Sequence, residues 1–278
     1  MHDAPGIAAL LLEVPGIELG QQSRPDIINI PGIPEDTLLK RMCAGKGLDR
    51  AEAAKISGSL SRYQEELAAA GWNIPQQYGA VLARVVSEWQ IWALERFVPG
   101  MTGAEIFRHE SNNSMKRHAL GQVLGTMASY TVANAPECTL FGRQLTPLPH
   151  GVDLKPANIV LDERGKIWMV DTFAPKTIGP EGDFELYSSK LEALPSDASR
   201  TVCGTRQGAL LRFLRKTQEL WLASGSSCTD EFMDDVDYAL ALTPLPPIET
   251  DVILSEMNMG YPWLDRIYAD DSLQALKE

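Results

Sequence analysis

Two short stretches of the chain, residues 150–161 and residues 170–173, constrain its fold more than any other feature. They read HGVDLKPANIVL and VDTF, so that Asn158 follows Asp153 by five positions and Asp171 follows Asn158 by thirteen. The apolar residues 159–161 and 167–170 predict two short buried strands, joined by a polar turn that contains a glycine. Because a hairpin of this size returns the chain, we expect Asn158 and Asp171 to lie side by side, with Asp153 close by on the preceding loop.

The two stretches resemble the catalytic loop and the metal-binding segment of the protein-kinase-like superfamily, whose signature is H-R-D-L-x-x-x-N followed by D-F-G. The spacing from Asp153 to Asn158 agrees, and Lys155 stands two residues after the acid, as in the Ser/Thr kinases of that family. There are departures as well. His150 lies three residues before Asp153 instead of two, no arginine precedes that acid, and Asp171 is followed by Thr-Phe instead of Phe-Gly.

The resemblance implies an α+β, bilobal protein-kinase-like fold. Residues 1–96 would form an N-lobe with a small antiparallel sheet and a helix, and residues 97–278 a mainly helical C-lobe. A chain of 278 residues is long enough for two such lobes.

The resemblance also implies roles for the residues of the two stretches. Asp153 would orient the acceptor hydroxyl, and Lys155 would place a cation beside the γ-phosphoryl group of ATP. Asn158 and Asp171 would hold Mg²⁺, which prefers oxygen ligands. His150 is expected to brace the loop and not to act as a general base.

Three further positions are expected to bind the nucleotide from the N-lobe. Residues 37–42 read as a strand that carries Lys40, whose family counterpart pairs with the phosphates and with a glutamate on the next helix. Residues 49–70 predict that helix, with an interruption at residues 57–59. Glu65 and Glu66 are its candidate partners for Lys40, and Glu66 is preferred. Residues 20–23 stand where the family has its phosphate-covering loop, in which Ser23 would be a donor; with one glycine, a plain hairpin turn is the alternative.

Residues 81–86 and 90–94 read as paired strands, and the segment that follows resembles the interlobe hinge of kinases. The resemblance implies that backbone groups at Glu95 and Phe97 bind adenine. Beyond the hinge, three- and four-residue spacing of apolar side chains predicts a buried helix over residues 115–130. Residues 209–222 predict an amphipathic helix with Arg212 among the cations on its polar side, and a last helix is expected near residues 261–276. Residues 174–200 read as a loop across the mouth of the site.

The net charge and the composition restrict the classes of molecule that the protein is expected to bind. The formal net charge of −12 argues against a nucleic-acid or anionic-membrane surface, because both require a basic footprint. No apolar run is long enough for a membrane span. The four cysteines are scattered without a C-x-x-C pair, which predicts reduced thiols in a cytoplasmic protein, with secretion as the alternative.

Three functions remain open on the sequence. The first is an ATP- and magnesium-dependent kinase of protein Ser or Thr, favoured by Lys155. The second is a small-molecule phosphotransferase like the aminoglycoside and choline kinases, favoured by the His-Gly before the acid and by the missing arginine. The third is a pseudokinase that binds a nucleotide or a partner, against which the joint presence of Lys40, Asp153, Asn158 and Asp171 argues. Since that arginine commonly receives an activation-loop phosphate in the family, its absence predicts no activation by phosphorylation.

Overall fold

The structure is a computed structural model. It describes residues 26–27, 34, 36–42, 48–85, 87–109, 113–130, 138–140, 143–148, 150–172, 176–178, 184–185, 204–223 and 229–268. Ser23 with its loop, and most of the expected loop over residues 174–200, lie outside the described residues.

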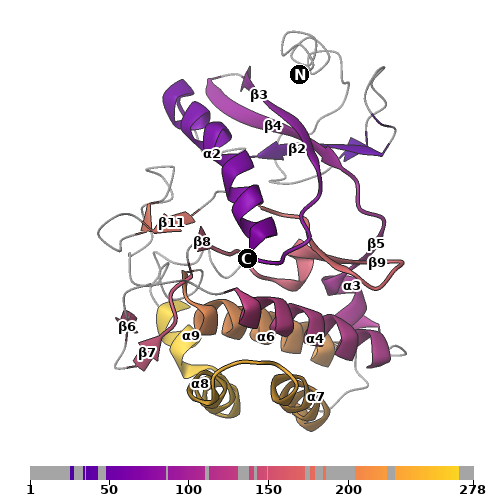
Figure 1. The fold of residues 1–278 in the computed structure, drawn as a ribbon, viewed down its shortest axis with the longest axis vertical. Coiled ribbons are helices and arrows are strands. Elements are labelled where there is room, and N and C mark those ends of the chain that lie inside the picture. Colours follow the sequence, from indigo (N-terminus) through magenta and orange to yellow (C-terminus); the bar gives the residue numbers. More distant parts are fainter. Residues whose placement is uncertain are drawn as a thin grey trace.

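A four-stranded antiparallel sheet forms one end of the molecule (Figure 1). Its strands are β1 (Asp26–Ile27), β2 (Thr37–Met42), β3 (Gln77–Val85) and β4 (Glu88–Arg96), in the order β1-β2-β4-β3. The bounds predicted for β2 are confirmed. Strand β4 extends two residues beyond the predicted 90–94 at each end, and β3 begins four residues before the predicted 81–86, because the ladder continues from Gln77↔Glu95 to Val85↔Glu88. Residue 86 lies outside the described residues.

The helix α2 (Arg50–Ala69) packs against this sheet. Asp49 caps its first turn in a capping box with Glu52, which satisfies donors that the helix leaves without a partner. The predicted interruption at residues 57–59 is wrong: the helix runs through it, because Ile56 and Leu60 on either side are both buried against the sheet. Gly71 ends the segment with a φ of +96°.

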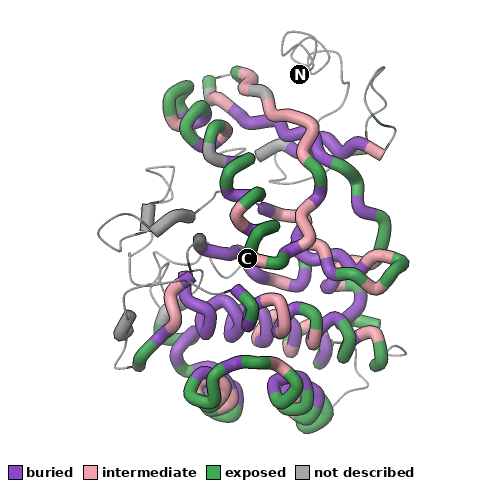
Figure 2. The backbone as a smooth tube through the Cα atoms, viewed as in Figure 1, coloured by how far each residue is buried: buried purple, intermediate pink, exposed green. Residues whose placement is uncertain are grey.

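The other end of the molecule is mainly helical (Figure 1). Its helices in the described part of the chain are α3 (Gly103–Arg108), α4 (Asn113–Ser129), α6 (Arg206–Ala223), α7 (Thr229–Ala241), α8 (Pro247–Asn258) and α9 (Pro262–Tyr268). The helices expected over residues 115–130 and 209–222 are confirmed, whereas α7 and α8 were not predicted. Buried residues run along much of α6, while α7 and α8 carry exposed outer faces (Figure 2).

The predicted hairpin lies between these two parts. It consists of β9 (Ile159–Asp162) and β10 (Ile167–Met169), paired with Leu161 opposite Ile167. Its turn is held by the Asp162 carboxylate, which accepts backbone N–H bonds of 2.9 Å from Arg164 and from Lys166. Burial of its apolar side chains contributes about 1.5–3 kcal/mol for each large one.

A third strand, β5 (Gly100–Thr102), joins this hairpin along β9. It follows directly from the end of β4, so the backbone that leaves the four-stranded sheet becomes part of the hairpin sheet. Gly100 has a φ of +153°, and a Cβ there would lie 2.2 Å from the carbonyl oxygen of Leu161. Only glycine fits this approach.

Short strands complete the description: β6 (Cys138–Leu140), β7 (Arg143–Leu145), β8 (His150–Gly151), β11 (Lys176–Ile178) and β12 (Phe184–Glu185), with a 3₁₀ turn, η1, at Pro156–Asn158. The described residues thus form a mixed α+β structure with a small antiparallel sheet and a mainly helical remainder. No helix among them is both long enough and apolar enough to cross a bilayer.

Candidate active site

The loop before the hairpin holds the first two predicted residues together. The Asn158 amide donates to the backbone carbonyl of Asp153 at 2.9 Å and to its carboxylate at 3.2 Å. The intervening η1 turn begins with Pro156, whose fixed φ suits the first position of a helical turn. Asn158 is buried, and the Asp153 side chain is 28% exposed. The carboxylate is therefore both oriented and accessible.

The hairpin brings Asp171 back to this loop, as the spacing predicted. The backbone N–H of Val170 donates to the carbonyl of Asn158 at 2.9 Å, so Asp171 is the next residue beyond that contact. Asn158, at the end of the η1 turn, and Asp171, two residues after β10, thus lie close along the backbone. Among the described residues no three His, Cys, Asp or Glu side chains cluster as metal ligands. Asn158 and Asp171 are the oxygen-bearing side chains that the hairpin brings near each other.

Two cations flank Asp153. Lys155 Nζ lies 3.8 Å from its Oδ2. The second cation is Arg212 of α6, whose guanidinium donates to Asp153 Oδ1. The prediction that Arg212 lies on the polar side of its helix is wrong, because its side chain is only 5% exposed. Its neighbours in sequence are Leu210, Leu211, Phe213 and Leu214, and such an apolar bracket is the signal that could have found it.

Lys40 lies above the same segment and has an unexpected partner. Its ammonium group is 2.7 Å from Glu95 Oε1 and also donates to the backbone carbonyl of Val170, next to Asp171. The predicted pair of Lys40 with Glu66 is wrong. Glu66 instead accepts from Arg62 at 2.9 Å on the outer side of α2. Helix periodicity explains the difference, since Tyr63, Gln64 and Leu67 are the buried residues of that turn.

The pKa of the Glu95 carboxyl reflects this setting. Burial raises it above the ordinary value, the ammonium group of Lys40 opposes that rise, and the negative charge of Asp171 adds to it. The carboxylates of Glu95 and Asp171 are thus close enough to repel each other, with the lysine between their two segments. Lys40 therefore lies between Glu95 and the backbone of the Asp171 segment.

The expected adenine contacts at Glu95 and Phe97 need correction. Glu95 belongs to the central strand β4 and has ladder partners on both sides, Leu38 and Gln77, so its backbone groups face other strands. The N–H of Phe97 donates to the carbonyl of Asp36. The Phe97 N–H is therefore not free to bind adenine, and Glu95 contributes its side chain, which pairs with Lys40.

Helix α2 is bonded to residues 151 and 172 by neutral groups. The Tyr63 hydroxyl donates to the carbonyl of Gly151 at 2.6 Å, and the Gln64 amide donates to the Thr172 hydroxyl at 2.9 Å. Thr172 thus takes part in a hydrogen bond to α2. The side chain of His150 lies outside the described residues.

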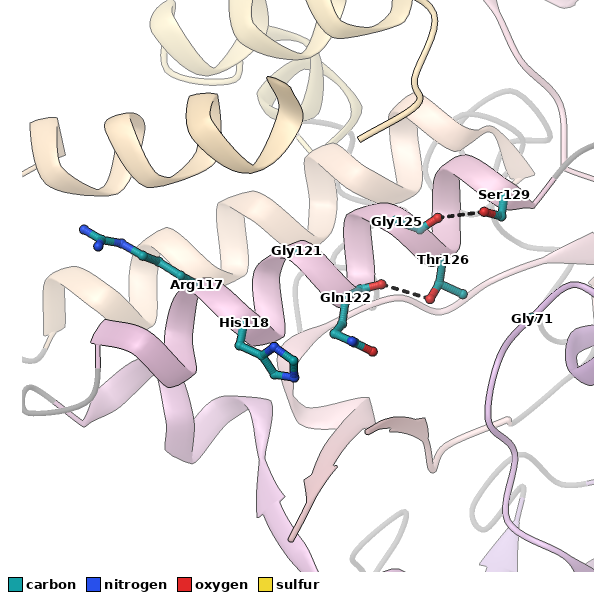
Figure 3. A pocket seen from close by; sticks show the side chains of 8 residues that line it. All are labelled: Gly71, Arg117, His118, Gly121, Gln122, Gly125, Thr126 and Ser129. Atoms are coloured by element: carbon teal, nitrogen blue, oxygen red, sulfur yellow. Dashed lines mark hydrogen bonds between the residues drawn. The ribbon is translucent and has the colours of Figure 1, made fainter. Parts of the chain in front are cut away.

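A hollow of about 520 Å³ on the outer face of α4 contains none of the predicted site residues (Figure 3). Three of its polar side chains have partners within the protein. Arg117 pairs with Asp235 at 2.6 Å, the His118 ring is bonded to the Gly165 carbonyl, and Thr126 donates to the carbonyl of Gln122. This hollow is an open helix surface and not a second chemical centre.

The comparisons with known proteins add no relationship to these observations. No protein-family model matches the sequence, and no curated protein matches it significantly.

Proposed function

We propose that this protein is an ATP- and magnesium-dependent kinase with a bilobal protein-kinase-like fold. The observation that carries the proposal is the convergence of Asp153, Asn158 and Lys155 with the Asp171 segment, which Lys40 contacts from the opposite side. Phosphoryl transfer requires mainly positioning and charge neutralisation, and these residue types supply both.

The side chains divide the work by position. Lys40 binds the phosphates from the sheet, and Lys155 neutralises charge on the transferred group. Magnesium, held by Asn158 and Asp171, would neutralise the charge on the phosphates. Asp153, fixed by Asn158 and Arg212, accepts a hydrogen bond from the acceptor hydroxyl and aims its oxygen at the γ-phosphorus.

The chemical step is an in-line displacement. A bond forms between the hydroxyl oxygen and the γ-phosphorus while the bond from that phosphorus to the β–γ bridging oxygen breaks. ADP leaves, and the hydroxyl proton passes to the Asp153 carboxylate late in a loose transition state. The basicity of Asp153 therefore matters less than its orientation.

The proposed acceptor is a protein Ser or Thr hydroxyl, as Lys155 favours, with a small hydroxylated molecule as the alternative. The test is incubation of the purified chain with labelled ATP and magnesium, alone, with generic protein, and with a panel of aminoglycosides and amino alcohols. Label in protein supports the first acceptor and label in a small molecule the second. Nucleotide binding without transfer in any of these would support the pseudokinase and overturn the proposal.

A further inference from the structure

The partner of the Lys40 ammonium group is Glu95, a residue of the same sheet. Lys40 lies opposite Ala93 in the ladder of β2 and β4, and Glu95 lies opposite Leu38. Residues two apart on a strand point to the same face, so Lys40 and Glu95 are diagonal neighbours on one face. Their side chains are 10% and 4% exposed, and the two charged atoms are 2.7 Å apart.

Helix α2 provides no carboxylate to Lys40. Its three glutamates are used elsewhere or exposed: Glu52 belongs to the capping box, Glu65 is exposed, and Glu66 pairs with Arg62. Among its described buried positions, Gln64 donates to Thr172, Tyr63 donates to Gly151, and the others are apolar. A buried ammonium group requires a counter-charge, and Glu95 meets that requirement.

The location of the acid has a mechanical consequence. A carboxylate in the same ladder as the lysine keeps a fixed position relative to it, whereas a carboxylate on a helix would move with that helix. The ladder here is continuous from Thr37↔Arg96 to Met42↔Ile91, and the pair lies within it.

We propose that Glu95 is the positioning residue for Lys40, holding its ammonium group against the phosphates of the nucleotide independently of any acid on α2. The inference rests on the proposed function, because it requires that a nucleotide binds at Lys40. Beyond the proposed function, the inference assigns the orientation of Lys40 to a strand residue, Glu95. It also implies that the glutamates of α2 do not switch the site on or off.

The experiment measures the affinity for Mg·ATP and the KM for ATP in Glu95→Gln and in Glu66→Gln. Glu95→Gln is expected to weaken both by about 10- to 100-fold, because a displaced lysine misplaces the phosphates. Glu66→Gln, which alters the acid that a helix-based pair would use, is expected to stay within about twofold, the effect of a surface charge. The opposite ranking would overturn the proposal.

A second variant, Lys40→Met, tests whether Glu95 acts by positioning Lys40 or has a general structural role. In a Lys40→Met background, Glu95→Gln is expected to cause no further loss of Mg·ATP affinity, since the two side chains act as one unit. Additive losses would contradict the inference. If Glu95→Gln does not fold, Glu95→Asp takes its place. Aspartate keeps the negative charge but its side chain is one methylene shorter, so the carboxylate lies farther from Lys40. We expect the KM for ATP to rise about tenfold, and an unchanged KM would overturn the inference.

The two possible failures are distinguishable. If the unaltered protein does not bind Mg·ATP, the proposed function fails and this inference with it. If the unaltered protein binds Mg·ATP and Glu95→Gln binds it equally well, only the inference fails.

Discussion

The proposed catalytic segment, residues 150–172, and the sheet that carries Lys40 reach the same site by different kinds of contact. In the catalytic segment the contacts among Asp153, Asn158 and Val170 span at most a short hairpin. In the sheet, Lys40 finds its acid on a strand more than fifty residues away in sequence. Local geometry thus determines one half of the site, and strand register determines the other half.

The largest expected effect concerns the catalytic segment. Asp153→Asn removes the carboxylate that orients the acceptor hydroxyl, and we expect the turnover rate to fall by about 10²- to 10⁴-fold. Steady-state kinetics at saturating Mg·ATP would measure it. Asp237→Asn on the exposed side of α7 is the matched control and should leave the rate unchanged. A rate within threefold of the original protein in Asp153→Asn would contradict the assignment.

Substitutions at two glycines test how closely β5, which joins the sheet to the hairpin, packs against β9. Gly100→Ala places a Cβ against the carbonyl of Leu161 and should lower the free energy of unfolding by about 3 kcal/mol. Gly58 lies inside α2, where an added Cβ would meet no other part of the protein within 4 Å. Gly58→Ala should therefore raise the free energy of unfolding by about 0.5–1 kcal/mol. Urea unfolding of both variants measures the contrast, and equal effects would show that β5 does not approach β9 so closely.

Arg212 tests the long-range support of the catalytic segment. Arg212→Met removes the bond to Asp153 and should lower the free energy of unfolding by about 1–3 kcal/mol, as for hydrogen bonds to charged groups. It should also reduce turnover more than it changes the KM for ATP. Lys216→Met on the same helix loses only a partly exposed pair with Glu219 and is expected to cost under about 1 kcal/mol. Equal free energies of unfolding for Arg212→Met and Lys216→Met would contradict the proposal that Arg212 stabilises the position of Asp153.

The smallest effect belongs to the capping box of α3. Hydrogen bonds from the backbone and hydroxyl of Thr102 lower the pKa of Glu105 from its ordinary value of 4.5. A lowered folded-state pKa contributes stability above the unfolded value, and this is lost as the pH falls through the folded value. Glu105→Gln should therefore lose about 0.3 kcal/mol at pH 7, after screening at this exposed site, and nothing at low pH. Thermal unfolding at pH 7 and pH 3 would measure this, and a constant difference would contradict it.

The sequence predicted what depends on neighbours along the chain. The hairpin, the strand of Lys40 and the adjacency of Asn158 to the Asp171 segment follow from spacing and apolar pattern. Partners set by tertiary packing were missed, since Glu95 reaches Lys40 through the ladder register and Arg212 reaches Asp153 from a distant helix. Helix α8 was missed because its proline-rich start reads as a break, although Pro247 occupies a first-turn position where proline is tolerated.

In the proposed function, Asn158 and Asp171 bind a metal–nucleotide complex beside Asp153. Titration calorimetry with ATP, with and without magnesium, on the original protein and on Asp171→Asn tests this binding. We expect binding that requires magnesium in the original protein and is lost in Asp171→Asn. Absence of ATP binding to the original protein, or equal magnesium-dependent binding in both proteins, would contradict the claim.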